Sequence, residues 1–138
     1  MIIPNETSII CYKSKPLLYK ALKTMQLIDE RVELDKATLN KLKQAGDDDQ
    51  LVRLIDHSFT ADSKEALEKL ADCLIKMDFS NIKLFQPEGE HYYLLECTSI
   101  DCTEFHNVSK TSVLMTILSE HFSVSYDGWG SMVANETQ

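Results

Sequence analysis

Three observations predict an α+β fold of the ferredoxin-like type for this chain of 138 residues. Alternating apolar and polar residues indicate strands, and apolar residues three and four positions apart indicate helices. From Leu51 onward these patterns follow the order strand, helix, strand, strand, helix, strand, which is typical of a four-stranded antiparallel sheet with two helices on one face. We expect one structural domain, made of an N-terminal arm and helical extension at 1–46 and a core at 47–138.

The extension is predicted to contain two short helices. Pro16 is tolerated in a first helical turn, and apolar residues recur at helical spacing as far as Met25. Asp35 is suited to cap a second helix that ends before Gly46. Residues 7–12 fit either a short strand or an unstructured arm.

The core begins with a predicted strand at 51–60, which places His57 on its apolar face. Asp62, followed three residues later by Glu65, resembles the capping box of a helix start. The helix that follows has the clearest apolar stripe in the chain, continuing as far as Met77.

A hairpin and a second long helix complete the unit. Strands are expected at 81–85 and 91–98, because the loop between them contains proline and glycine. The second helix fits 104–121, and the last strand begins near Ser123. The face of the sheet that these helices do not cover needs solvent, the N-terminal segment or a partner.

The chain is acidic, with 14 Lys and Arg against 22 Asp and Glu and a formal net charge of −8. Affinity for a phosphate backbone comes mainly from Lys and Arg, so nucleic acid is not expected as a direct partner. The sequence contains no apolar run of membrane-spanning length and no recognisable secretion signal. We therefore predict a cytoplasmic protein with reduced thiols and no membrane contact.

Few residues are arranged for catalysis. His57 fits a core or interface histidine bonded to a neighbour better than a general base. The sequence has no helical zinc pair, phosphate loop or nucleophile elbow, and Cys97 and Cys102 lack the C-x-x-C spacing. We predict a protein that is not an enzyme and has no catalytic residue, metal or cofactor. An enzyme would need His57, Asp127 and a cysteine in one polar cleft.

Two segments are candidates for binding a protein partner. The acidic run at 47–49 is predicted to be a solvated loop. The segment 126–130 holds the only tryptophan and two of the four glycines, after a predicted strand. Trp129 either covers the edge of the core or is an exposed anchor for a partner. With the strand histidine, the candidate partner-binding residues are Asp47, Asp48, Asp49, His57, Tyr126, Asp127, Gly128, Trp129 and Gly130.

The sequence Tyr-Asp-Gly-Trp-Gly at 126–130 resembles the ending of the regulator of ribonuclease E activity B family. The segments 46–48, 55–59 and 66–71 also fall in the order expected for that family. The resemblance covers about 34–134 and departs from the family in a longer N-terminal arm and a shorter, less acidic stretch at 86–90.

The resemblance implies a small, acidic, cytoplasmic bacterial protein that binds ribonuclease E and inhibits its RNA cleavage. In the mechanism we hypothesise, the acidic run steers the protein toward an arginine-rich, RNA-binding segment of the nuclease. Tyr126 and Trp129 then provide apolar anchoring. The alternative is a small ligand-binding or protein-binding module of the same fold with no link to ribonuclease, using the uncovered sheet face or the 128–130 bend.

Overall fold

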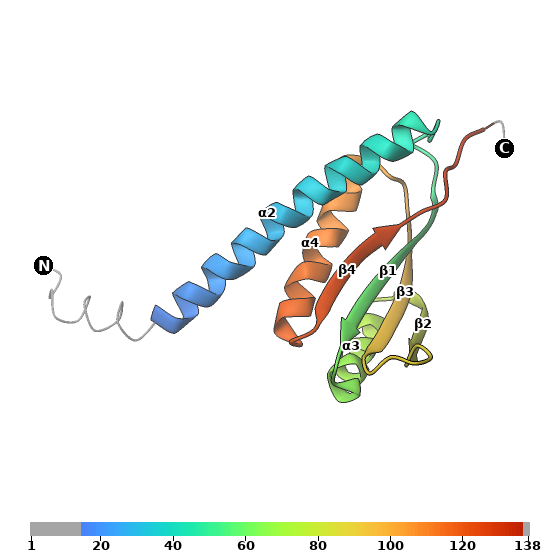
Figure 1. Cartoon of the computed structure of the whole chain (residues 1–138). Helices are drawn as coiled ribbons and strands as arrows, with labels where there is room; N and C mark the ends of the chain where they lie inside the picture. The colour runs from blue at the N-terminus through green and yellow to red at the C-terminus, as the bar shows by residue number, and fades with distance from the viewer. Residues whose placement is uncertain (1–14, 137–138) are drawn as a thin grey trace, which may run out of the picture.

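The computed structural model describes residues 15–136 and confirms the predicted α+β fold (Figure 1). The four strands form one antiparallel sheet in the order β2-β3-β1-β4. The predicted arm at 7–12 lies outside the described residues. In chain order the elements are α2 (Lys15–Gln44), β1 (Arg53–Ala61), α3 (Lys64–Lys76), β2 (Ser80–Phe85), β3 (Tyr93–Asp101), α4 (Phe105–His121) and β4 (Ser125–Gly130).

From residue 15 onward the extension forms a single helix, so the prediction of two short helices with a break before Asp35 was wrong. Helix α2 runs for 30 residues without interruption. Asp35, which we predicted to cap a second helix, lies inside α2 and is fully buried. The sequence suggested a helix start because aspartate is common at N-caps, but here its carboxylate is bound by side chains from α4 and β4.

Helix α2 packs beside α4, and its N-terminal half extends beyond the body of the molecule (Figure 1). This half exposes more than half of each of five large apolar side chains, those of Leu17, Leu18, Tyr19, Leu22 and Met25. Partly buried residues begin at Thr24 and continue through the second half of α2, where Asp35 is fully buried. Only part of the extension is therefore held by the core.

Strand β1 lies inside the sheet and places Ile55, His57 and Phe59 on its buried face, as predicted. Helix α3 covers that face with a fully buried stripe that ends at Leu74. Met77 is 39% exposed, so the stripe is shorter than predicted.

The start of α3 is one residue later than the sequence suggested. Ser63, rather than Asp62, is the N-cap, and its hydroxyl oxygen accepts a hydrogen bond from the backbone N–H of Ala66 at 3.1 Å. Helix α4 begins after Glu104 and buries Val108 and Met115 against the core.

The segment 126–130 forms most of strand β4, which corrects the prediction that it follows a strand. Tyr126 pairs with Phe59 and Trp129 pairs with His57, so three steps along β4 match two steps along β1. The extra residue forms a bulge, which changes the alternation of faces. Without it, residues three positions apart would lie on opposite faces; with it, both aromatic rings lie on the buried side.

Candidate partner-binding site

Trp129 connects β4 to the extension helix. Its indole Nε1–H donates a 2.8 Å hydrogen bond to Oδ1 of Asp35, and the hydroxyl of Ser112 on α4 donates to the other carboxylate oxygen. Burial raises the pKa of Asp35, while these two hydrogen bonds and the charge of Arg31 act in the opposite direction. This geometry favours Trp129 as a cover for the edge of the core over Trp129 as an exposed anchor.

Arg31 forms a second connection between α2 and β4. Its Nη2 donates a 3.1 Å hydrogen bond to the carbonyl oxygen of Tyr126, and the guanidinium lies 4.8 Å from the centroid of that ring. Gly128 has φ of +117°, and a Cβ there would lie 3.0 Å from Nη1 of Arg31. Glycine at this position therefore leaves room for the arginine as well as allowing the backbone conformation.

His57 forms hydrogen bonds through both ring nitrogens. Nδ1 lies 2.9 Å from the hydroxyl oxygen of Tyr126, and Nε2 lies 2.9 Å from the hydroxyl oxygen of Ser99. Burial lowers the pKa of His57 to about 4, an effect that the charge of Asp56 only partly offsets. Burial also raises the pKa of the Tyr126 hydroxyl. Both side chains are neutral near pH 7 and lie beneath the surface, as expected for a bonded core histidine.

The groups that an enzyme would need do not meet in one cleft. Asp127 is exposed and accepts 3.3 Å hydrogen bonds from the hydroxyls of Thr60 and Ser125, on the face of the sheet opposite His57. Burial, with the charge of Asp56, raises the pKa of the Cys97 thiol to about 12, so this thiol is protonated near pH 7.

The acidic run is not uniformly solvated, which corrects the prediction for Asp47. Its side chain is 2% exposed and accepts 2.8 Å hydrogen bonds from Arg53 Nη1, Thr103 Oγ1 and the backbone N–H of Ala134. Burial would raise the pKa of Asp47, but the three hydrogen bonds and the arginine charge lower it overall. Asp47 thus joins the loop after α2 to β1 and the C-terminal segment.

The other two aspartates of the run are more accessible. Asp48 is half-buried and accepts a hydrogen bond from the backbone N–H of Gln50, whereas Asp49 is exposed. Both line a hollow of about 490 Å³ beside the end of α2, together with Lys43 and Phe105. They remain available for contact with a partner.

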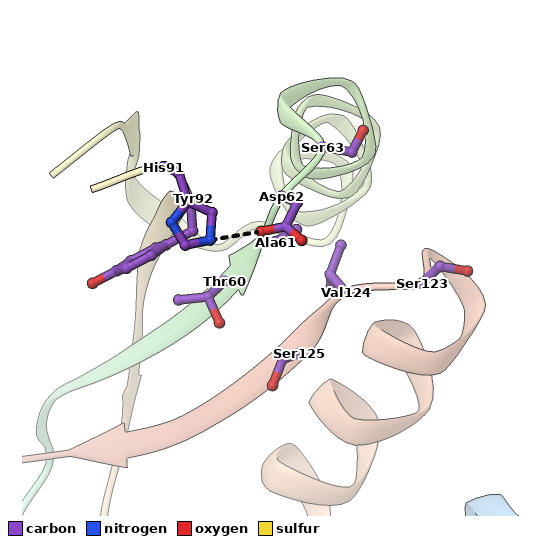
Figure 2. A pocket seen from close by; sticks show the side chains of 9 residues that line it. All are labelled: Thr60, Ala61, Asp62, Ser63, His91, Tyr92, Ser123, Val124 and Ser125. Carbon is purple, nitrogen blue, oxygen red and sulfur yellow. Dashed lines mark ion pairs between the residues drawn. The ribbon is translucent and has the colours of Figure 1, made fainter. Parts of the chain in front are cut away.

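An open hollow of about 640 Å³ lies where the ends of β1 and β4 meet the loop before β3 (Figure 2). His91 Nε2 and Asp62 Oδ1 are 3.7 Å apart across it, and both side chains are 86% exposed. The hydroxyl of Ser63 is already used to cap α3. Sequence reasoning missed this hollow because its lining comes from separated segments, and it lies away from the predicted 128–130 bend.

Within residues 15–136, no cluster of three or more His, Cys, Asp or Glu side chains is placed to hold a metal ion. None of the helices in this range is long and apolar enough to cross a membrane. Three cysteines of the described range, Cys73, Cys97 and Cys102, are free thiols.

Comparison with known proteins decides the family. The family model described as regulator of ribonuclease activity B matches residues 33–131, which include the complete sheet, α3, α4 and the part of α2 that contains Asp35. The chain belongs to this family. The first half of α2 lies outside the matched region.

Curated relatives agree with this assignment. The regulator of ribonuclease activity B of Escherichia coli (strain K12) is 31% identical over 108 residues, covering 75% of this chain and 78% of that protein. The protein of the same name from Xenorhabdus nematophila is 25% identical over 108 residues, covering 76% of this chain and 77% of the relative. The Psychromonas ingrahamii protein is 25% identical over 117 residues, which is 81% of this chain and 95% of the relative.

Proposed function

We propose that this protein binds ribonuclease E and inhibits its endonucleolytic cleavage of RNA, thereby modulating RNA turnover. The observation that carries the proposal is the match of residues 33–131 to the regulator of ribonuclease activity B family. The choice of ribonuclease E rests on the resemblance of the segment 126–130 to the ending of that family. We place this activity in the cytoplasm and assign it to protein binding rather than catalysis.

The acidic character of the chain supports competition with RNA. A ribonuclease must hold its substrate with Lys and Arg, because these side chains supply most of the affinity for phosphate. A protein with net charge −8 is attracted to the same basic surface. Attraction between exposed charges is screened beyond about 8 Å at physiological ionic strength, so inhibition should weaken as salt is added.

We divide the candidate residues between two roles according to their exposure. Asp48, Asp49 and Asp127 have accessible carboxylates that can contact a basic partner. Tyr126 and His57 are 7% and 3% exposed and hold β4 against the core. We therefore assign contact with the nuclease to the accessible carboxylates and support of the fold to the buried residues.

The test is a cleavage assay with purified ribonuclease E and a fluorogenic RNA, over a range of concentrations of this protein. We expect the cleavage rate to fall as the protein is added and to recover between about 50 and 300 mM salt, as screening predicts. A gel-shift control with the RNA alone should show no binding by this protein. Unchanged cleavage at every concentration, with no retention on immobilised nuclease at low salt, would contradict the proposal.

A further inference from the structure

We propose that the face of the sheet opposite α3 and α4, which we call the outer face, docks a cationic segment of the ribonuclease. This inference rests on the proposed function and assigns it a surface. Helix α3 contacts three strands and α4 contacts β4, all on the side that holds the buried core. Side chains on alternate residues point to the other side, where Leu54 is 55% exposed and Ile100 is 67% exposed.

Three strands contribute a carboxylate to the outer face. Asp56 on β1 and Glu96 on β3 alternate with the buried residues of their strands, and the bulge in β4 places Asp127 on the same side. A positive charge on this face comes from Lys83 on β2, which is the cross-strand partner of Glu96. Among residues 15–136, none of the three carboxylates forms an ion pair. The face therefore carries an excess of negative charge available to a partner.

Exposed apolar side chains lie at both ends of this acidic area. Leu54 and Ile100 are cross-strand partners at one end. At the other end Phe85, which is 42% exposed, is paired with Leu94, and Leu94 is level with Thr60 on β1. Six residues of strand separate Leu54 from Thr60, which corresponds to about 20 Å. A helix of about 13 residues has the same length.

The charge of the outer face selects its occupant. Nucleic acid phosphates would be repelled, and two copies of this chain meeting through this face would place carboxylates against carboxylates. A segment with Lys or Arg in its middle and an apolar side chain at each end matches both features. Because Lys and Arg side chains supply most of the affinity for RNA phosphates, capture of such a segment here would compete with substrate.

The first experiment maps the surface directly with a defined probe. A synthetic peptide of about 14 residues, with arginines in its middle and two leucines at each end, is titrated into the ¹⁵N-labelled full chain at low salt. We expect the largest amide shifts at Asp56, Glu96 and Asp127, and smaller shifts around Asp48 and Asp49. Shifts confined to the loop after α2, or no saturable shifts, would overturn the docking surface.

The second experiment uses charge variants with a matched control. Each variant replaces three carboxylates by isosteric amides, so both variants have the same net charge. In the outer-face variant, the amide oxygens at 56 and 127 can still accept the hydrogen bonds that Thr98, Thr60 and Ser125 donate to the carboxylates. The control carboxylates are exposed on α3, on the opposite side of the sheet. The outer-face variant is Asp56→Asn with Glu96→Gln and Asp127→Asn, and the control variant is Glu65→Gln with Glu68→Gln and Asp72→Asn.

We expect the outer-face variant to lose tenfold or more in affinity for the peptide and for ribonuclease E, and the control variant to lose less than about threefold. Replacing Leu54 and Ile100 by threonine should weaken binding severalfold without changing its salt dependence, because only apolar contact is lost. Equal losses for the two charge variants would overturn the proposal, since they would show an effect of net charge alone.

Two experimental outcomes distinguish the docking surface from the proposed function. If the wild-type protein leaves ribonuclease E cleavage unchanged but the peptide maps to the outer face, the docking surface stands and the proposed function falls. If cleavage is inhibited equally by wild type and the outer-face variant, the function stands and the docking surface is wrong.

Discussion

Replacement of Trp129 by phenylalanine tests the connection between β4 and α2. Phenylalanine keeps an apolar ring but has no N–H, so the fully buried carboxylate of Asp35 would keep only the donor from Ser112. A hydrogen bond to a charged group contributes about 1.5–3 kcal/mol, and leaving a buried charged acceptor short of a donor adds to the loss. We expect the free energy of unfolding to fall by about 3 kcal/mol, or about 10 °C in Tm for a chain of this size.

The assay is urea denaturation followed by far-UV circular dichroism, because the variant lacks the only tryptophan. A double-mutant cycle with Asp35→Asn isolates the interaction. Asparagine is neutral, so its bond to the indole is weaker and the same Trp129→Phe change should cost about 1 kcal/mol less in that background. An equal cost in both backgrounds, or a loss below about 0.5 kcal/mol in the wild type, would refute the reasoning.

Three further predictions concern other buried contacts. The pKa of His57 is about 4 in the folded protein and about 6.5 in the unfolded chain. Its contribution of about 3 kcal/mol to the free energy of unfolding is therefore present above pH 6.5 and is lost as the pH falls toward 4. Urea denaturation at several pH values checks this, and His57→Gln should flatten the dependence of stability on pH between 6.5 and 4. Arg53→Met leaves the carboxylate of Asp47 buried without its cation and should cost about 3–5 kcal/mol in urea denaturation, so a loss below 1 kcal/mol would count against a structural ion pair. Gly128→Ala should lower the free energy of unfolding by about 2 kcal/mol in thermal denaturation, because φ is positive there and the new Cβ approaches the guanidinium of Arg31. In the control Gly130→Ala the new Cβ meets no atom within 4 Å, so the stability should change little.

The sequence pattern predicted the sheet and the two core helices well, because burial on one face produces a regular period. Strand β1 and helix α3 are within a few residues of their predicted ends. The ends themselves were less certain, since Asp62 and Ser63 are both good N-caps and only the backbone conformation distinguishes them.

The polar contacts could not be read from local sequence. The partners of Asp35 lie 77 and 94 residues away along the chain, and the partners of Asp47 include Ala134, 87 residues away. One signal was present, because Asp35 continues the apolar stripe of α2 between Val32 and Leu39. A carboxylate in the buried stripe of a helix requires donors from another element.

The last strand was predicted to begin near Ser123, close to the observed start of β4 at Ser125, but its end was placed too early for a related reason. Two glycines in five residues usually indicate a turn, whereas here they accompany a bulge and the close approach of Arg31. The composition of the segment drew attention to its aromatic residues, but the direction of their side chains depends on pairing with β1.

The bulge in β4 makes this strand sensitive to its length as well as to its composition. Substitutions at 126–130 change one contact at a time, and each has a bounded effect on stability. Removal of Asp127, the extra residue, would restore regular pairing and leave Tyr126 and Trp129 on the same face, whereas one further residue between them would turn Trp129 to the other face or shift its pairing with β1. Relatives that keep this strand should therefore rarely carry an insertion between the two aromatic residues, and such an insertion would mark a changed attachment of the extension helix.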